Sequence, residues 1–313
     1  MNGKRKISQF LSLRIALIGL CTVAIMLGLT TGSALAQEDP PDEKPAAAET
    51  AQPATPAAAT THPGGAASLG EAATNPIAPL MQLQLQNTYN WKNHNSDSYS
   101  NTSVIQTVIP VKLPWDKVPG AITRLTLPYV TTPDFDDPLD RQRGFGDTNF
   151  LFLATPKLKA KKQQIGVGFS ATFPTAGDND FTGSGKWQAG PAFLYINMKT
   201  PKLQWGFFGY QQWDFASTSS GSDRSGVSKT YLQPFITKHF GKGWFVGSPE
   251  TPQVYDSNSD KWTWALGPQL GKVFKIGKQP VKAFGAIYYN PENNNGPTPE
   301  WTGKVGISFL FPE

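Results

Sequence analysis

Residues 82–91 read Gln-Leu-Gln-Leu-Gln-Asn-Thr-Tyr-Asn-Trp, and this alternation decides the fold. Successive side chains of a β-strand point to opposite faces, so the stretch predicts a strand with one apolar and one fully polar face. Residues 301–311 repeat the pattern: Trp301, Val305, Ile307, Phe309 and Phe311 alternate with Thr302, Lys304, Gly306 and Ser308. The mean hydropathy is −0.34 although aromatics make up 12% of the chain, which is typical of strands between lipid and water.

Ten further candidate strands lie between these two. They cover 103–113, 121–131, 147–156, 164–174, 186–198, 203–215, 228–239, 244–254, 261–273 and 280–290. An even number of strands of about ten residues is typical of bacterial outer-membrane barrels. The sequence therefore predicts an all-β fold, a transmembrane antiparallel up-and-down β-barrel of twelve strands. Alternation is poor in 203–215 and 228–239, and prolines within strands soften several boundaries.

The connections alternate in length and charge. Every second connection, starting with 92–102, is mostly long and rich in aspartate, whereas the others, such as 157–163, are shorter and rich in lysine. Short periplasmic turns and longer outer loops are the known asymmetry of these barrels. We therefore expect both ends of the barrel domain on the periplasmic side.

Tryptophans gather near the predicted strand ends. Amphipathic indole rings prefer the membrane–water interface, so these residues predict an interfacial aromatic belt. The belt comprises Trp91, Trp115, Trp187, Trp213, Trp244, Trp262 and Trp301. The alternative, a soluble β-sandwich, would place core tryptophans in mid-strand.

Residues 1–36 have the pattern of a secretory signal peptide. A basic start, including Lys4 and Arg14, precedes an apolar run over 15–29 and the small-residue site Ala34-Leu35-Ala36. We expect cleavage before Gln37 and export to the cell outer membrane. The alternative is a retained anchor, for which the apolar run is short. A lipoprotein is excluded because Leu20 precedes Cys21, where a small residue is required.

Removing this segment changes what the composition implies. The full chain has 28 basic and 23 acidic residues, and the segment holds four of the basic ones. The near-neutral remainder indicates no nucleic-acid partner. The remainder also contains no cysteine, which excludes a disulfide scaffold and thiol-ligated metal sites. It has no apolar run of about 18 residues that would predict a membrane helix.

Residues 37–74 are rich in Ala, Pro, Thr and Glu and offer no large apolar side chain before Leu69. This composition predicts a disordered periplasmic linker ahead of a barrel domain at 75–313. The linker is either a spacer that contacts the cell wall or simply disordered.

Several segments together resemble a known family. They are Asn75-Pro76-Ile77, Val108-Ile109-Pro110-Val111, Leu127-Pro128, Gly144-Phe145-Gly146-Asp147, Gly183-Ser184-Gly185-Lys186-Trp187, Tyr231-Leu232-Gln233-Pro234-Phe235 and Leu310-Phe311-Pro312. Their order and spacing resemble the outer-membrane transporter family named after the MetA pathway of phenol degradation, some members of which carry the label neuromedin U. The resemblance implies a β-barrel and transport of small, aromatic or hydrophobic molecules. It implies no catalytic or binding residues. The segment 248–252 departs from the family pattern and puts the strand at 244–254 in doubt.

The polar faces of the strands are the candidate functional surface. A charged side chain is costly at mid-depth on a lipid face, so Lys112 and Arg124 should point inward or lie at a rim. The predicted lumen-lining residues are Gln84, Gln86, Gln106, Lys112, Arg124, Asp147, Asn149, Lys186, Gln188, Gln233 and Gln269. Side chains fill the interior of an eight-stranded barrel, whereas a sixteen-stranded barrel leaves an open channel, and a barrel of twelve strands falls between them. The lumen is therefore either a solute path or a plug of mutually bonded side chains.

Catalytic and metal chemistry finds little support. Of the histidines, His62 falls in the linker, His94 in an outer loop and His239 at an inner strand end, so they cannot cluster. Residues 183–186 lack the first glycine of a phosphate-binding loop. Aspartates at 134–137 and 178–180 could hold a hard cation or form solvated loops. We predict no enzyme activity, no cofactor and no metal.

Three hypotheses follow for the function. The first is a passive transporter or narrow channel for small solutes, aromatic or hydrophobic ones among them. The second is a non-conducting structural or adhesive barrel, and the third is a lipid-modifying enzyme in the barrel wall. The expected partners are outer-membrane lipids and lipopolysaccharide, the barrel-assembly machinery during insertion, and a small-molecule solute.

Overall fold

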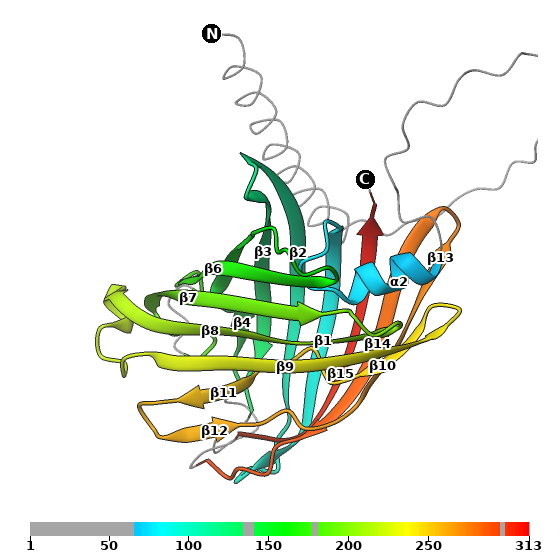
Figure 1. The fold of residues 1–313 in the computed structure, drawn as a ribbon. Coiled ribbons are helices and arrows are strands. Elements are labelled where there is room, and N and C mark those ends of the chain that lie inside the picture. The colour runs from blue at the N-terminus through cyan, green and yellow to red at the C-terminus, as the bar shows by residue number, and fades with distance from the viewer. Residues whose placement is uncertain (1–65, 134–140, 177–180, 295–297, 313) are drawn as a thin grey trace, which may run out of the picture. The chain divides into compact units, whose positions relative to one another are not determined.

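A computed structural model describes residues 66–133, 141–176, 181–294 and 298–312 (Figure 1). Its elements are α2 (Ala66–Thr74), β1 (Met81–His94), β2 (Ser100–Trp115), β3 (Val118–Thr131), β4 (Arg143–Phe145), β5 (Thr148–Thr155), β6 (Gln163–Phe173), β7 (Lys186–Asn197), β8 (Leu203–Ser217), η2 (Ser219–Gly221), β9 (Ser228–Gly241), β10 (Trp244–Gly247), β11 (Gln253–Asp256), β12 (Lys261–Thr263), β13 (Gln269–Ile276), β14 (Gln279–Tyr289) and β15 (Thr298–Phe311). No helix among these residues is long and apolar enough to cross a membrane.

The strands close into an antiparallel barrel. Each barrel strand pairs with the next along the chain, and β15 returns to pair with β1 from Met81↔Phe311 to His94↔Thr298. β10 pairs with both β9 and β13, which completes the ring. The ring contains twelve strands, β1–β3, β5–β10 and β13–β15, as predicted. In Figure 1, β6–β9 cross in front of β1–β3.

Two of the predicted strands are interrupted. The segment predicted as one strand over 244–254 is β10 and β11, separated by residues 248–252. Pro249 and Pro252 have no backbone N–H to donate to a ladder, which accounts for the break. The segment predicted over 261–273 is likewise β12 and β13, with Pro268 just before β13. β11 and β12 form a hairpin, and β11 pairs with residues 229–232 near the start of β9; the hairpin is visible at the lower left of Figure 1.

The predicted linker boundary also differs from the structure. Residues 66–74 are the helix α2, whereas the composition predicted disorder up to residue 74. The signal peptide and residues 37–65 of the linker lie outside the described residues. The physical reason for the helix is that its apolar side chains find partners inside the barrel. Ala73 is buried, and Leu69 and Ala72 pack against the same core cluster.

The barrel wall is apolar outside, and its inner face is polar along β1 and β15. On β1, Leu85 and Trp91 are exposed on the outer face, while Gln82, Gln84 and Asn90 are buried on the inner face. β15 alternates in the same way, with Val305 exposed and Ser308 buried. A soluble protein buries its apolar side chains, so this reversed pattern is the one expected of a barrel in a lipid bilayer.

Adjacent residues of β1 supply a test of this wall. Replacing outward-facing Leu85 with arginine should lower the free energy of unfolding by about 2–4 kcal/mol at the bilayer midplane, and by less near its surface. The control is Gln86→Arg, which places the same charge in the lumen and should cost less. Denaturant titration of the protein folded into vesicles measures both. Equal losses would mean that the outer face is not in lipid.

Candidate functional site in the barrel lumen

A cavity of about 320 Å³ lies inside the barrel. Side chains of β1–β3, β5, β7–β9 and β13–β15 line it, together with residues 73–76 and residues 248–250 and 252 of the inward segment. One part of its wall is rich in amides, another is apolar, and a third carries charges. The register of the strands explains how each part arises.

The amide wall belongs to a row of polar residues that strand pairing aligns around the inner face of the barrel. Strand pairing aligns Ser308, Gln84, Gln106, Thr126, Asn149, Thr172 and Gln188 across seven neighbouring strands. Neighbouring members of this row are hydrogen-bonded: Gln106 Nε2 donates to Gln84 Oε1 at 3.0 Å, and Thr126 Oγ1 donates to Gln106 Oε1 at 3.2 Å. Gln86 and Gln84 continue the chain along β1, each donating to the preceding glutamine. Mutual bonding fixes these amides in place and satisfies their polar atoms.

The apolar wall comes from neighbouring strands of the same barrel. Ile122, Leu151, Leu153, Leu194 and Phe208 line the cavity and belong to one buried cluster. Such side chains supply contact area for an apolar solute without asking for hydrogen bonds.

The charged wall depends on the interrupted strand. Residues 248–252 line the lumen, and Glu250 Oε1 accepts a bond from Lys282 Nζ at 2.9 Å. Lys304 Nζ donates to the Glu250 carbonyl oxygen at 2.7 Å. Gln269 Nε2 also reaches the Glu250 carboxylate, at 3.2 Å. The strand break thus brings an acidic side chain to two lysines of β14 and β15.

Arg124 lines the same cavity from β3. Its strand neighbours are Val108 and Leu151, so the register places it among apolar side chains. Its guanidinium lies 5.3 Å from the Phe208 ring centroid, a cation–π distance. Its Nε is buried and has no hydrogen-bond partner among the described residues.

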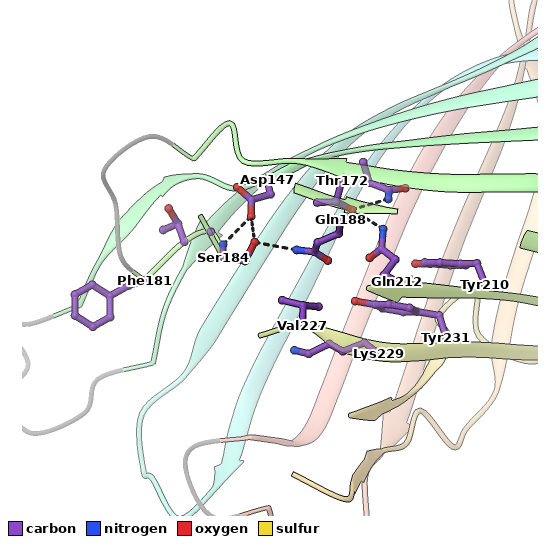
Figure 2. A pocket seen from close by; sticks show the side chains of 13 residues that line it. Asp147, Thr172, Phe181, Ser184, Gln188, Tyr210, Gln212, Val227, Lys229 and Tyr231 are labelled. Atoms are coloured by element: carbon purple, nitrogen blue, oxygen red, sulfur yellow. Dashed lines mark hydrogen bonds between the residues drawn. The ribbon is translucent and has the colours of Figure 1, made fainter. Parts of the chain in front are cut away.

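A second cavity, of about 460 Å³, lies towards the end with the longer loops (Figure 2). Asp147 Oδ2 accepts from the Ser184 backbone N–H at 2.6 Å and from its Oγ at 2.7 Å, and Gln188 Nε2 donates to that Oγ at 2.8 Å. These bonds tie the approach to β7 to the start of β5. The cavity is therefore framed by a fixed polar rim.

Two stacked tyrosines lie where the two cavities adjoin. The Tyr210 and Tyr231 rings lie 4.4 Å apart at 7°, and Figure 2 shows them at the inner side of the outer cavity. Tyr210 and Asn149 line both cavities, so the two spaces meet at these residues. The lumen therefore contains two adjoining cavities rather than a fully packed core.

The short-turn end of the barrel is occupied by residues 69–80, which we call the plug segment. Ile77 is buried among Leu151, Leu153 and other residues of the apolar wall. Thr74 Oγ1 donates to Gln204 Oε1 at 3.0 Å and lies 3.1 Å from His239 Nε2. Asn75 Nδ2 donates to Gln164 Oε1 at 2.9 Å. Polar and apolar contacts thus hold this segment against the inside of the barrel.

The structure places the predicted lumen residues in three groups. Those that line the inner cavity are Gln84, Gln86, Gln106, Arg124, Asn149, Gln233 and Gln269. Asp147 and Gln188 line the outer cavity with Asn149. Lys186 is buried, and its Nζ donates to Ser217 Oγ at 2.9 Å. Lys112 lines neither of these two cavities.

Sequence reasoning missed several cavity residues, namely Glu250, Lys282, Lys304, Tyr210, Tyr231 and the plug segment. Lys282 and Lys304 could have been predicted from the sequence, because a charge on a lipid face is as costly for them as it is for Arg124. Glu250 carried no such signal, since it stands between two prolines outside any alternating pattern.

The tryptophans and histidines take the following places. Trp91, Trp115, Trp187, Trp213, Trp244 and Trp301 are exposed, and Trp262 is half-buried and stacks on Trp264. His94 Nε2 lies 2.8 Å from the Asn290 carbonyl oxygen, while His239 contacts the plug segment. His62 and the aspartates at 134–137 and 178–180 lie outside the described residues. Within the described residues, no three His, Cys, Asp or Glu side chains could together hold a metal ion.

No protein-family model and no curated protein matches this chain. An outer-membrane channel from Pseudomonas putida F1 aligns with 74% of the chain and 96% of its own length, at 14% identity and a TM-score of 0.53. Outer-membrane phospholipase A from Escherichia coli aligns with 76% of the chain and 93% of its own, at 13% identity and a TM-score of 0.39. A FadL homologue from Pseudomonas aeruginosa aligns with 78% and 92%, at 9% identity and a TM-score of 0.31. The first likeness shows a shared barrel fold, and we draw nothing from the two with lower scores.

Proposed function

We propose that the protein is an outer-membrane barrel that passively transports small solutes. The observation that carries the proposal is the pair of adjoining cavities along the barrel lumen, joined at Tyr210 and Asn149. Selectivity in such a pore depends on its width and on the groups that line it. The apolar wall at Leu151 and Phe208 favours solutes with an aromatic or aliphatic body. The Pseudomonas putida protein that shares the barrel fold is an outer-membrane channel, which supports the proposal.

The protein would lie in the outer membrane and contact several partners there. The outward apolar wall would contact outer-membrane lipids and lipopolysaccharide after insertion by the barrel-assembly machinery. The end with short turns would face the periplasm, following export by a cleaved signal peptide. Membership of the family named after the MetA pathway stays a prediction.

Swelling of vesicles containing the purified protein tests the transport proposal. Vesicles with folded protein should swell in an isosmotic solution of glycine faster than vesicles without it, and more slowly in sucrose, because the cavities are narrow. Protein that has been heat-unfolded before reconstitution is the control. Absence of swelling in both solutes with folded protein would overturn the proposal.

The plug segment favours a second candidate, a non-conducting barrel with a structural or adhesive role. Its contacts with Gln164, Gln204 and His239 occupy the end opposite the outer cavity. The two candidates differ in whether this segment moves. Variants that loosen it discriminate between them, as described in the Discussion.

A further inference from the structure

The inner cavity carries more positive than negative charge. Its lining contains three cationic side chains, Arg124, Lys282 and Lys304, and a single carboxylate, Glu250. Glu250 is already engaged by Lys282 at 2.9 Å. Lys304 donates to the Glu250 carbonyl oxygen and lies 3.3 Å from Thr251 Oγ1. Arg124 is left without an acidic partner among the lining residues.

The surroundings of Arg124 do not account for its charge. Val108 and Leu151 flank it in the sheet, Phe208 lies under its guanidinium, and its Nε is buried without a partner among the described residues. A cation inside the barrel with no counter-charge is costly to the fold. Ionisable groups inside the membrane-spanning part of a protein are rare and mark solute or ion pathways.

Arginine is suited to one class of ligand in particular. Its planar fork of N–H donors matches a carboxylate and can hold both oxygens at once. The space next to Arg124 is apolar, being lined by Ile122, Leu153 and Leu194. A ligand whose charged end lies on Arg124 would therefore place an apolar body against these side chains, within about 320 Å³.

We infer that the inner cavity is a binding site for small monocarboxylates with an apolar body, and that Arg124 holds the carboxylate. The inference rests on the proposed transport function and names the solute class of that same lumen. The amide row from Gln84 to Thr126 is occupied by its own hydrogen bonds, and Lys304 is held by the Glu250 carbonyl oxygen and Thr251 Oγ1, so the distinction between solutes falls to the arginine. The pair of Lys282 and Glu250 is neutral as a unit and would not compete for the ligand.

Calorimetric titration of the folded protein in lipid nanodiscs tests the site. The probes are benzoate, benzamide as the uncharged analogue, and acetate as the carboxylate without an apolar body. Benzoate should bind more tightly than either of the others. Arg124→Gln should weaken benzoate binding by about ten- to a hundredfold, the value of a hydrogen bond to a charged group, and leave benzamide unchanged.

Two further variants keep this test decisive. Arg124→Lys retains the charge and should retain part of the preference for benzoate, while losing the two-pronged geometry. Arg143→Gln removes an exposed arginine of β4 and should change nothing. Equal affinity of the wild type for benzoate and benzamide would overturn the inference. A benzoate affinity that Arg124→Gln leaves unchanged would also overturn it. An effect of Arg143→Gln equal to that of Arg124→Gln would overturn it too.

Failure of this inference and failure of the transport proposal give different results. Swelling of vesicles with the same preparations in an isosmotic solution of arabinose, an uncharged sugar, reports transport without involving a carboxylate-selective site. Swelling without benzoate preference would leave a channel that lacks the site. Benzoate preference without swelling would leave a binding barrel that does not conduct.

Discussion

Replacing Ile77 with alanine is expected to raise solute permeation through the barrel by about thirtyfold or more. Ile77 is 4% exposed and packs in the cluster that contains Leu151 and Leu153. A large-to-small change at such a site costs about 2–5 kcal/mol. If the plug segment leaves the lumen as a unit, this loss shifts its equilibrium towards the open state, at about tenfold for every 1.4 kcal/mol.

Vesicle swelling with glycine measures this effect. The matched control is Ile287→Ala, which removes the same atoms from an outward-facing residue that is 54% exposed. It should leave permeation unchanged. Unchanged permeation in Ile77→Ala, with the protein still folded, would show that the plug segment does not limit the path and would favour the non-conducting barrel.

Replacing Glu250 with glutamine is expected to lower the free energy of unfolding by about 3–5 kcal/mol. The change leaves Lys282, whose side chain is only 3% exposed, as a buried cation without its counter-charge. An exposed ion pair gives the comparison. Lys229 and Asp256 lie 3.5 Å apart, and this lysine is 39% exposed. Asp256→Asn should therefore cost only about 0–1 kcal/mol.

Reversible urea unfolding of the protein in vesicles measures both losses. The double variant Glu250→Gln with Lys282→Met should recover most of the stability, because it removes the unpaired cation as well. A loss in Glu250→Gln no larger than in Asp256→Asn would show that this ion pair does not hold residues 248–252 in the lumen.

Alternation along the strands was enough to predict the barrel. The reason is that a strand presents its side chains to two faces, so polar residues at every second position must share a side. Gln84, Gln86 and Gln106 were predicted in the lumen on this basis and line the inner cavity. Lys112 was predicted there too, but it lines neither cavity. Alternation of odd and even positions along a strand fixes the side of the wall on which a residue lies, but not its height along the barrel.

The strand break at residues 248–252 was visible in the sequence, but its consequence was not. Two prolines explain why pairing stops there. That Glu250 then meets Lys282 and Lys304, residues 32 and 54 positions later, depends on the closed ring bringing β10, β14 and β15 around one lumen.

The plug segment differs more sharply from its sequence-based prediction. An Ala-rich helix of nine residues is marginal by itself, so disorder was the sound inference from composition. It forms here because Ala73 packs in a buried cluster and because Thr74 and the following Asn75 find partners on β6, β8 and β9, which lie 89 to 165 residues further along the chain. Only tertiary contacts of this kind could place that segment across the short-turn end of the barrel.

The alternation at residues 82–91, repeated along the other strands, thus determined that the chain forms a barrel with an apolar exterior and polar residues on its inner face. Local side-chain order is sufficient for that, because the two faces of a strand meet different solvents. Tertiary structure alone decided what fills the interior: the plug segment, the ion pair of Glu250 and the solitary guanidinium of Arg124. Each of these depends on which distant strands the ring brings together, and no local pattern encodes that distance.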